Sequence, residues 1–388
     1  MTGDRLRAFF NTTEHDAIRA SARAFVDSEL TPNAERWDHE GIPRSAFAAV
    51  GEMGFLGARY PESIGGAGGD LLSAIPVVEE MSRCRSGGFV TSYLVQAHIS
   101  TPIIQHLGTA EQREEFLRPA LSGSRVGCLA VTEPDAGSDV SALRTTARRV
   151  GGDWVLNGSK MYITNGGVAD FAVVAAKTDG GPAHASISLF LVDTHQAGFQ
   201  PSQPLDKLGL RASNTVGISL DDVLVPSRNL LGEEGRGFRY IMSGFQEERL
   251  VSSIYAYESA FQAIEDTMAY LSDRRAFGAS LIERQAIRHT LAQLTAELEA
   301  VRHLCYSAAW RINDGKDATR EVSMCKLLAA EIANRVAYQA MQFHGGYGYM
   351  EECPIARYYR DVRLYAIGGG ASEVMREIIS KRMFDEQS

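Results

Sequence analysis

The sequence has little of what marks proteins built on disulfides, bound to nucleic acid or embedded in a membrane. Its five cysteines are scattered and never form a CxxC pair, so neither a disulfide framework nor a metal site is expected. A formal charge of −9, with no Lys/Arg block, argues against a nucleic-acid partner. No apolar run approaches membrane length, and the N-terminal MTGDRLRAFFNTTEHD has no long apolar core. We therefore expect a cytoplasmic protein with no membrane partner.

The first third of the chain has a helical pattern. With 388 residues, 45% of them hydrophobic and 22% charged, the chain is a globular protein of two or three domains. Thr13 followed by Asp16 resembles a capping signal, and Pro32 is expected to end the helix that follows. Apolar residues recur at helical spacing in between: Ile18, Ala22, Phe25, Val26 and Leu30. A helical N-terminal domain is predicted over residues 1–124.

The pattern changes near residue 125. Short β-rich runs, among them GCLAVTE, DFAVVAAKT and ISLFLVD, are separated by Gly, Asp and Asn. Gly151-Gly152 is a suitable hairpin turn between two of these runs. No helical segments alternate with the strands, so a central β domain over 125–235 is expected rather than a parallel α/β sheet.

Helical spacing returns at about residue 236. One apolar stripe runs along a single predicted helix: Ile287, Leu291, Leu294, Leu298, Val301 and Leu304. Long helices with such stripes usually pack as antiparallel bundles, which predicts a C-terminal helical bundle over 236–388. The fold class is therefore mainly α with a central β domain.

Several stretches can carry chemistry, although each has a structural explanation. VTEPDAGSD (131–139) is either a surface turn or a loop that offers amides and hydroxyls to a flat heterocycle. KMYITNGG (160–167) places Tyr162 where its ring packs in a core or covers a bound ring. DRRAFG (273–278) has an arginine beside a helix break, suited to a pyrophosphate or to solvent. His344, alone near a glycine turn, is expected to be structural.

Taken together, these motifs resemble the acyl-CoA dehydrogenase family of flavoproteins. VTEPDAGSD, YITNGG, KLGLRASNT, VLVPSRNLLGEEGRGF, RRAFG, FHGGYGYMEE and RDVRLYAIGGGASEV follow family patterns in the right order. The resemblance implies an α-helical N-domain, a β-barrel-like middle domain and a C-terminal four-helix bundle. It implies FAD as cofactor and oxidation of an acyl-CoA thioester to its trans-2-enoyl form. A carboxylate removes the α-proton and the β-hydride passes to flavin N5. Homotetramers and an electron-transferring flavoprotein as acceptor are implied too.

The resemblance also assigns cofactor positions. The flavin is expected to lie against Leu129, Val131, Thr132, Gly137, Ser138, Tyr162, Ile163 and Thr164. Tyr162 stands where a Trp is common. The cofactor of a neighbouring subunit is expected to contact Arg274, Phe277, Gln285, Gln342, Phe343, Gly345 and Gly346. The adenosine side is expected to face Ala371, Ser372 and Glu373. Ala371 departs from the usual Thr.

The catalytic base is the least obvious assignment. Many relatives carry the base as a Glu in a YEGTSE-like segment, but here GGGASE places Gly369 at that position. Isovaleryl- and long-chain-type relatives carry the base on an earlier helix, in a segment ending ERL, and GFQEERLV (244–251) supplies it. Helical periodicity does not choose between Glu247 and Glu248, whereas the resemblance chooses Glu248. The N–H of Gly369 is expected to polarise the thioester carbonyl. Substrate contacts are assigned to Ser138, Gln246, Arg249 and Gly370.

A carboxylate facing an apolar tunnel should have a raised pKa, which suits a base that must also release its proton. Three alternatives remain open: a carrier-protein-bound acyl substrate, an oxidase that uses oxygen directly, and an inert flavin-binding homologue. Chain length is set partly by the helix that carries Thr91, Leu94, Val95 and Gln96, and those side chains do not rank substrates.

Overall fold

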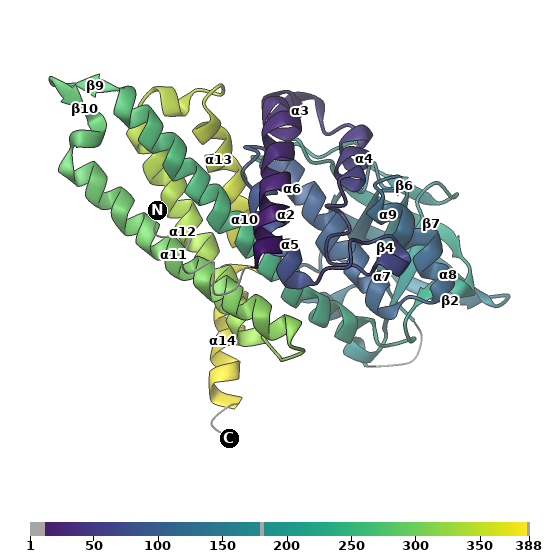
Figure 1. Cartoon of the computed structure of the whole chain (residues 1–388). Helices are drawn as coiled ribbons and strands as arrows, with labels where there is room; N and C mark the ends of the chain where they lie inside the picture. Colours follow the sequence, from purple (N-terminus) through teal and green to yellow (C-terminus); the bar gives the residue numbers. More distant parts are fainter. Residues whose placement is uncertain (1–11, 179–181, 386–388) are drawn as a thin grey trace.

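A computed structural model describes residues 12–178 and 182–385, in the order helices, sheet, helices (Figure 1). The first eleven residues, where the sequence predicted no apolar leader, lie outside the described residues. Within the described part, no helix combines the length and apolarity that crossing a bilayer requires. The five cysteines are buried and free.

The N-terminal region is helical, as predicted. Its helical segments are α2 (Thr13–Phe25), η1 (Val26–Leu30), η2 (Thr31–Asn33), α3 (Ala34–Glu40), α4 (Arg44–Glu52), η3 (Glu62–Ile64), α5 (Leu71–Met81), α6 (Gly87–Leu94), η4 (Val95–Ser100), α7 (Thr101–Leu107), α8 (Ala110–Gln112), η5 (Arg113–Leu117) and α9 (Arg118–Leu121). Together with the C-terminal helices they enclose one large apolar core.

Two local predictions in this region are wrong. The helix is capped by Thr12 rather than Thr13, because the Thr12 hydroxyl accepts from the His15 N–H and the His15 ring accepts from the Thr12 N–H. Pro32 does not end the helical path. A π-helical segment and a 3-10 turn carry the chain directly into α3. Pro32 lies in the first positions of that turn, where its missing N–H costs little.

The middle region is an eight-stranded sheet in the order β6-β7-β3-β2-β4-β5-β8, with β1 paired to β4. The strands are β1 (Gly127–Ala130), β2 (Thr146–Val150), β3 (Asp153–Thr164), β4 (Phe171–Lys177), β5 (Ile187–Asp193), β6 (Phe199–Pro201), β7 (Thr215–Val225) and β8 (Leu230–Leu231). Short 3-10 segments are η6 (Val140–Ala142), η7 (Ala183–Ala185) and η8 (Ser227–Asn229). The hairpin predicted at Gly151-Gly152 is confirmed, with φ of +60 and +101.

The central strands are buried on both faces. Along β4, Phe171, Val173 and Ala175 pack towards helices α7 and α9, whereas the alternate residues Ala172 and Val174 face a second core enclosed by the sheet itself. These strands therefore read as continuous apolar runs rather than as an alternating pattern.

The C-terminal region is built on three long helices that lie side by side in Figure 1. Its elements are α10 (Gly237–Asp273), β9 (Arg275–Ala276), β10 (Ala279–Ser280), η9 (Leu281–Glu283), α11 (Gln285–Asn313), α12 (Thr319–His344), η10 (Tyr347–Tyr349), α13 (Pro354–Val362), η11 (Arg363–Ala366) and α14 (Ser372–Asp385). The apolar stripe predicted for one helix lies along α11, and its members pack into the main core. Helix α14 projects at the lower end of the bundle in Figure 1 and is tied to α12 by an ion pair between Arg376 and Glu331.

The three regions meet at one buried carboxylate. Asp361 of α13 accepts a hydrogen bond from the N–H of Gly87 (3.1 Å), at the start of α6, and one from Leu210 (2.6 Å), in the middle region. The first residue of α10, Gly237, packs directly against the backbone of Ile187 in β5. These contacts fix α6, α10 and α13 relative to the sheet.

Candidate active site

The glycine turn before α14 and the helix α10 come together at Glu248. Gly369 has φ +66, a conformation that favours glycine, and a Cβ added there would lie 3.3 Å from Oε1 of Glu248. The carboxylate of Glu248 therefore lies in the space that a side chain at position 369 would enter. Two residues far apart in sequence, both singled out by the resemblance, form one site.

The neighbouring carboxylate is engaged elsewhere. Glu247 accepts two hydrogen bonds from the guanidinium of Arg59, at 2.5 and 2.9 Å. This bidentate pair holds Glu247 against the N-terminal region. Glu248 and Glu247 therefore project in different directions from α10, a distinction that helical spacing alone does not give.

Two cations hold the glycine turn in place. Nζ of Lys326, a buried residue of α12, donates to the carbonyl oxygens of Tyr365 and Gly368, the latter at 2.9 Å. Nε of Arg249 donates to the carbonyl of Gly369 at 3.3 Å, and it lies 3.5 Å from the position that a Cβ on Gly370 would occupy. Both contacts use carbonyl oxygens of the turn. The N–H of Gly369 makes no hydrogen bond to another described residue.

The electrostatics of Glu248 suit a base. Burial raises the pKa of the Glu248 carboxyl above its ordinary value, and the nearby charges of Arg249 and Lys326 only partly oppose this shift. Burial lowers the pKa of Lys326 to about 8, so that its amine still carries charge at neutral pH. A carboxylate of raised pKa beside a free amide can take a proton next to a carbonyl group.

The expected flavin residues of the middle region differ in exposure: Gly137, Ser138 and Tyr162 are exposed, Leu129, Thr132 and Thr164 are half-buried, and Val131 and Ile163 are buried. Met161 and Tyr162 of β3 lie opposite a single residue of β7, which makes a β-bulge. The N–H of Met161 donates to the carbonyl of Thr132 (2.9 Å), joining the bulge to the 131–139 loop. Tyr162 has φ +60 and is 66% exposed, while the next residue, Ile163, is buried. At Gly137 an added Cβ would meet nothing within 4 Å, and Ser138 is exposed.

The sequence analysis did not identify Glu133, the residue that anchors the 131–139 loop. Glu133 is buried and accepts hydrogen bonds from Lys160 Nζ (2.7 Å) and from the N–H and hydroxyl of Thr145 (2.9 and 2.5 Å). Burial opposes ionisation of Glu133, but Lys160 and these hydrogen bonds outweigh it, so its pKa lies below its usual value. The signal available in sequence was the period-two position of Lys160, on the same face of its strand as Trp154 and Leu156, where a buried lysine has to find a partner.

The remaining cofactor candidates lie at the far end of the bundle. Arg274 caps the C-terminus of α10, about 39 Å of helix rise from Glu248, and Phe277 lies in the turn between β9 and β10 that follows. Tyr270 stacks on His344 (ring centroids 4.4 Å apart), which brings the end of α12 to the same place. The exposed members of this distal cluster are Arg274, Phe277, Gln285, Gln342, Gly345 and Gly346, with Phe343 half-buried beside them.

Three further predicted residues follow the glycine turn, and two others stand apart. Ala371 precedes α14, Ser372 and Glu373 open it, and the side chain of Glu373 is mostly exposed. Gln246 is half-buried, two residues before Glu248. Nδ1 of His344 bonds to the carbonyl of Ala340 (2.8 Å) within its own helix, as a structural histidine does. The described residues contain no group of three or more His, Cys, Asp or Glu that could hold a metal ion.

Comparison with known proteins gives the class to which this fold and site belong. The chain matches the acyl-CoA dehydrogenase N-terminal domain over residues 12–124, the middle domain over 128–223 and the C-terminal domain over 235–384. The chain therefore belongs to the acyl-CoA dehydrogenase family, whose members are flavin-dependent oxidoreductases.

Particular relatives differ in the substrate that their names give. The chain is 38% identical to the mitochondrial long-chain specific acyl-CoA dehydrogenase of Rattus norvegicus, covering 100% of this chain and 90% of that one. It is equally 38% identical to the mitochondrial short-chain specific enzyme of Mus musculus, covering 97% and 92%. It is 32% identical to a glutaryl-CoA dehydrogenase of Mycobacterium smegmatis solved with FADH2, with a TM-score of 0.91 and coverage of 97% and 96%.

Proposed function

We propose that this chain oxidises an acyl-CoA thioester to its trans-2-enoyl form, with Glu248 as the base that removes the α-proton. The observation that carries the proposal is the approach of the Glu248 carboxylate to Gly369, whose N–H is free to face a ligand. A base and an oxyanion donor thus converge on one point, as proton abstraction next to a carbonyl requires.

Each residue of the site has a distinct role in the proposed reaction. The Gly369 N–H donates to the thioester carbonyl and stabilises the negative charge that develops on its oxygen as the α-proton leaves. Oε1 or Oε2 of Glu248 takes that proton and later returns it to solvent, which its raised pKa favours. Arg249 and Lys326 hold the carbonyls of the turn and so fix the direction of the Gly369 amide.

The residues present fit a flavin. Tyr162 is exposed, the space over Gly137 is open and Ser138 is exposed, and the hydrogen bond from the Met161 N–H to the Thr132 carbonyl joins the strand of Tyr162 to their loop. FAD bound there supplies the acceptor for the β-hydride. We propose that the electrons then pass to an electron-transferring flavoprotein.

The test is anaerobic titration of the purified yellow protein with saturated acyl-CoAs, following the flavin absorbance. Glu248→Gln should retain flavin yet be bleached roughly 10²–10⁴-fold more slowly, the usual contribution of a general base. Glu247→Gln is the matched variant and should keep most of the rate, because Glu247 is paired with Arg59. An equal loss in both variants, or full activity of Glu248→Gln, would contradict the assignment.

The same titration distinguishes the alternative functions. A yellow protein that no acyl-CoA bleaches, but that a carrier-bound acyl group does, would point to a biosynthetic substrate. Rapid peroxide formation on aerobic turnover would identify an oxidase.

A further inference from the structure

We propose that Asp361 of α13 is a positioning residue for this reaction: it sets the placement of the Gly369 turn relative to the strand end that is proposed to hold the flavin. The inference rests on the proposed function, because proton removal by Glu248 and hydride transfer to the flavin have to act on neighbouring carbons of one acyl chain. The rate of such a reaction depends on alignment, and a misplacement of about 1 Å can cost roughly 10²-fold.

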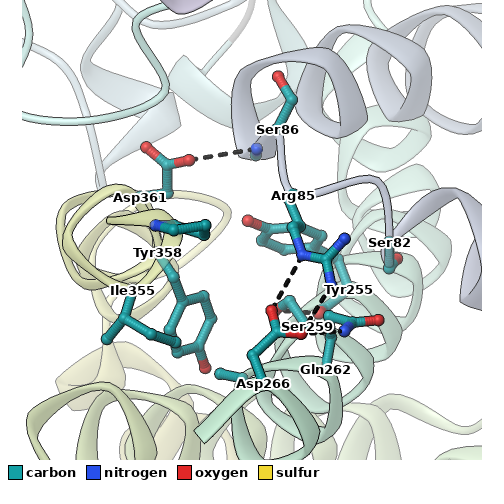
Figure 2. A pocket seen from close by; sticks show the side chains of 13 residues that line it. Ser82, Arg85, Ser86, Tyr255, Ser259, Gln262, Asp266, Ile355, Tyr358 and Asp361 are labelled. Carbon is teal, nitrogen blue, oxygen red and sulfur yellow. Dashed lines mark hydrogen bonds and ion pairs between the residues drawn. The ribbon is translucent and has the colours of Figure 1, made fainter. Parts of the chain in front are cut away.

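The Asp361 carboxylate accepts backbone N–H groups from two other regions of the chain. Oδ2 accepts that of Gly87 (3.1 Å), at the start of α6, and Oδ1 accepts that of Leu210 (2.6 Å), in the 208–214 loop. Asp361 is 2% exposed, and Figure 2 shows its carboxylate directed at the start of α6, beside a small cavity. Leu210 has φ +53, a strained value for leucine, so the loop needs such a contact to keep its path.

The 208–214 loop lies directly on the backbone of both neighbouring helices. A Cβ added to Gly209 would lie 2.4 Å from the carbonyl carbon of Arg360, in α13. A Cβ added to Gly88, in α6, would lie 2.7 Å from the amide nitrogen of Ser213. Because neither glycine has a side chain to act as a spacer, a shift of α13 is passed directly to the loop.

The same loop holds the end of strand β3. Asn214, its last residue, accepts the N–H of Asn165 at its carbonyl (2.7 Å) and the N–H of Gly167 at its side chain (2.9 Å). Thr164, an expected flavin contact, immediately precedes Asn165. The strand end proposed to hold the flavin is therefore linked to Asp361 through the loop.

In the other direction, α13 leads through η11 into the glycine turn. The hydroxyls of Tyr365 in η11 and Thr91 in α6 are hydrogen-bonded at 2.8 Å, and Nζ of Lys326 donates to the carbonyl of Gly368 at 2.9 Å. The contact at Asp361 includes the 208–214 loop as well as α6. It is therefore the link between the turn and the strand end.

The contact is strongest when Asp361 is ionised, because two N–H donors favour the charged form. Burial raises the pKa of Asp361 to about 7, and the nearby Asp38 adds to this shift, whereas the two N–H groups and the charge of Arg357 oppose it. The experiment is therefore made at pH 8, where the carboxylate form predominates.

The experiment compares the flavin-loaded wild type with three variants by anaerobic stopped flow, using whichever of butyryl-CoA and dodecanoyl-CoA reduces the wild type faster. Asp361→Asn leaves one of the two N–H groups facing an amide NH₂ group. Gly209→Ala forces the loop off α13 without removing a charge, and it keeps the test valid if Asp361→Asn folds poorly. Each should lower the limiting rate of flavin reduction roughly 10–10²-fold. The half-saturating thioester concentration should change little, and the flavin should stay bound.

Hydrogen exchange of the backbone amides, measured by mass spectrometry with and without flavin, is the second readout. Exchange over residues 208–215 should be faster in both variants. Asp38→Asn is the matched control, because Asp38 is a buried carboxylate that pairs with Arg357 (3.6 Å) and Arg360 (3.5 Å) of the same helix. It should lower the melting temperature and leave the limiting rate unchanged.

Unchanged exchange over residues 208–215, or faster exchange with an unchanged limiting rate, would overturn the inference alone. An equal loss of rate in Asp38→Asn would do the same, as would loss of the flavin from Asp361→Asn and Gly209→Ala. A wild type that neither thioester reduces would overturn the proposed function, and this inference with it.

Discussion

At the scale of single residues, the site depends on Lys326, a buried lysine that influences the ionisation of the Glu248 carboxylate without touching it. Lys326 ties the glycine turn through two carbonyl oxygens and also lies close to Glu248, because its Cε and Oε1 of Glu248 both approach the same point at Gly369. Its charge lowers the pKa of Glu248 and so works against the effect of burial.

Replacing this lysine should therefore change the pH profile as well as the rate. Glu248 acts only when ionised, so in the wild type kcat/KM is lost as the pH falls through a pKa above the ordinary Glu value. Lys326→Met removes the opposing cation and should move this acid limb to higher pH. It should also lower kcat, because the turn loses two hydrogen bonds. Flavin reduction followed by stopped flow between pH 5 and 9 measures both effects.

Lys381→Met is the control for a lost positive charge, since Lys381 is exposed on α14. It should leave both quantities unchanged. A slower Lys326→Met enzyme with an unmoved acid limb would show that the lysine acts on the turn alone.

At the scale of elements, the 131–139 loop depends on the buried Glu133–Lys160 pair. Glu133→Gln leaves the Lys160 charge without its partner and should cost about 3–5 kcal/mol of stability, with a matching loss of flavin. Calorimetry and the flavin-to-protein ratio measure the two effects. Asp135→Asn in the same loop breaks only an exposed pair with Arg144 and should be nearly neutral. Equal melting temperatures for the two variants would contradict this role.

Elements with a strong repeat could be predicted from sequence. The stripe on α11 was predicted because apolar residues recur there at helical spacing. The Gly151-Gly152 turn was predicted because glycine readily adopts the positive φ that such a turn requires. The path through Pro32 and the bulge at Tyr162 could not be predicted, because each is a local departure from a regular repeat. The bulge is also joined to a distant loop by the hydrogen bond from the Met161 N–H to the Thr132 carbonyl. Tyr162 adopts φ +60, which no pattern in its own strand indicates.

The candidate site also has features that the sequence pattern alone could not predict. The pairing of Glu247 with Arg59, and the meeting of Glu248 with Gly369, are tertiary contacts that a helical repeat cannot encode. Choosing Glu248 from the sequence therefore depended on resemblance rather than on periodicity.

At the scale of the whole molecule, the distal cluster at the hairpin end of α10 cannot serve the flavin site of its own chain. About 39 Å of helix separates Glu248 from Arg274. Phe277, at the tip of the hairpin, is 97% exposed, an unusual position for a phenylalanine. These features support the expectation of a homotetramer in which this cluster contacts a cofactor held by a neighbouring subunit.

Phe277→Ser should therefore weaken assembly and flavin retention together. Sedimentation velocity and the flavin-to-protein ratio test this directly, with Leu224→Ser, an exposed apolar position on β7, as control. A wild-type monomer that keeps one flavin per chain would contradict the shared-cofactor arrangement.

The close approach of Glu248 to Gly369 also constrains how such a site changes over generations. A Cβ at position 369 would lie 3.3 Å from Oε1 of Glu248 and 3.6 Å from Cε of Lys326, so a side chain there would require the Glu248 carboxylate to shift. The φ of +66 adds a backbone penalty for any residue other than glycine. In a lineage that moves its base between these positions, we therefore expect the gain of a side chain at position 369 to be accompanied by a displacement or loss of the Glu248 carboxylate.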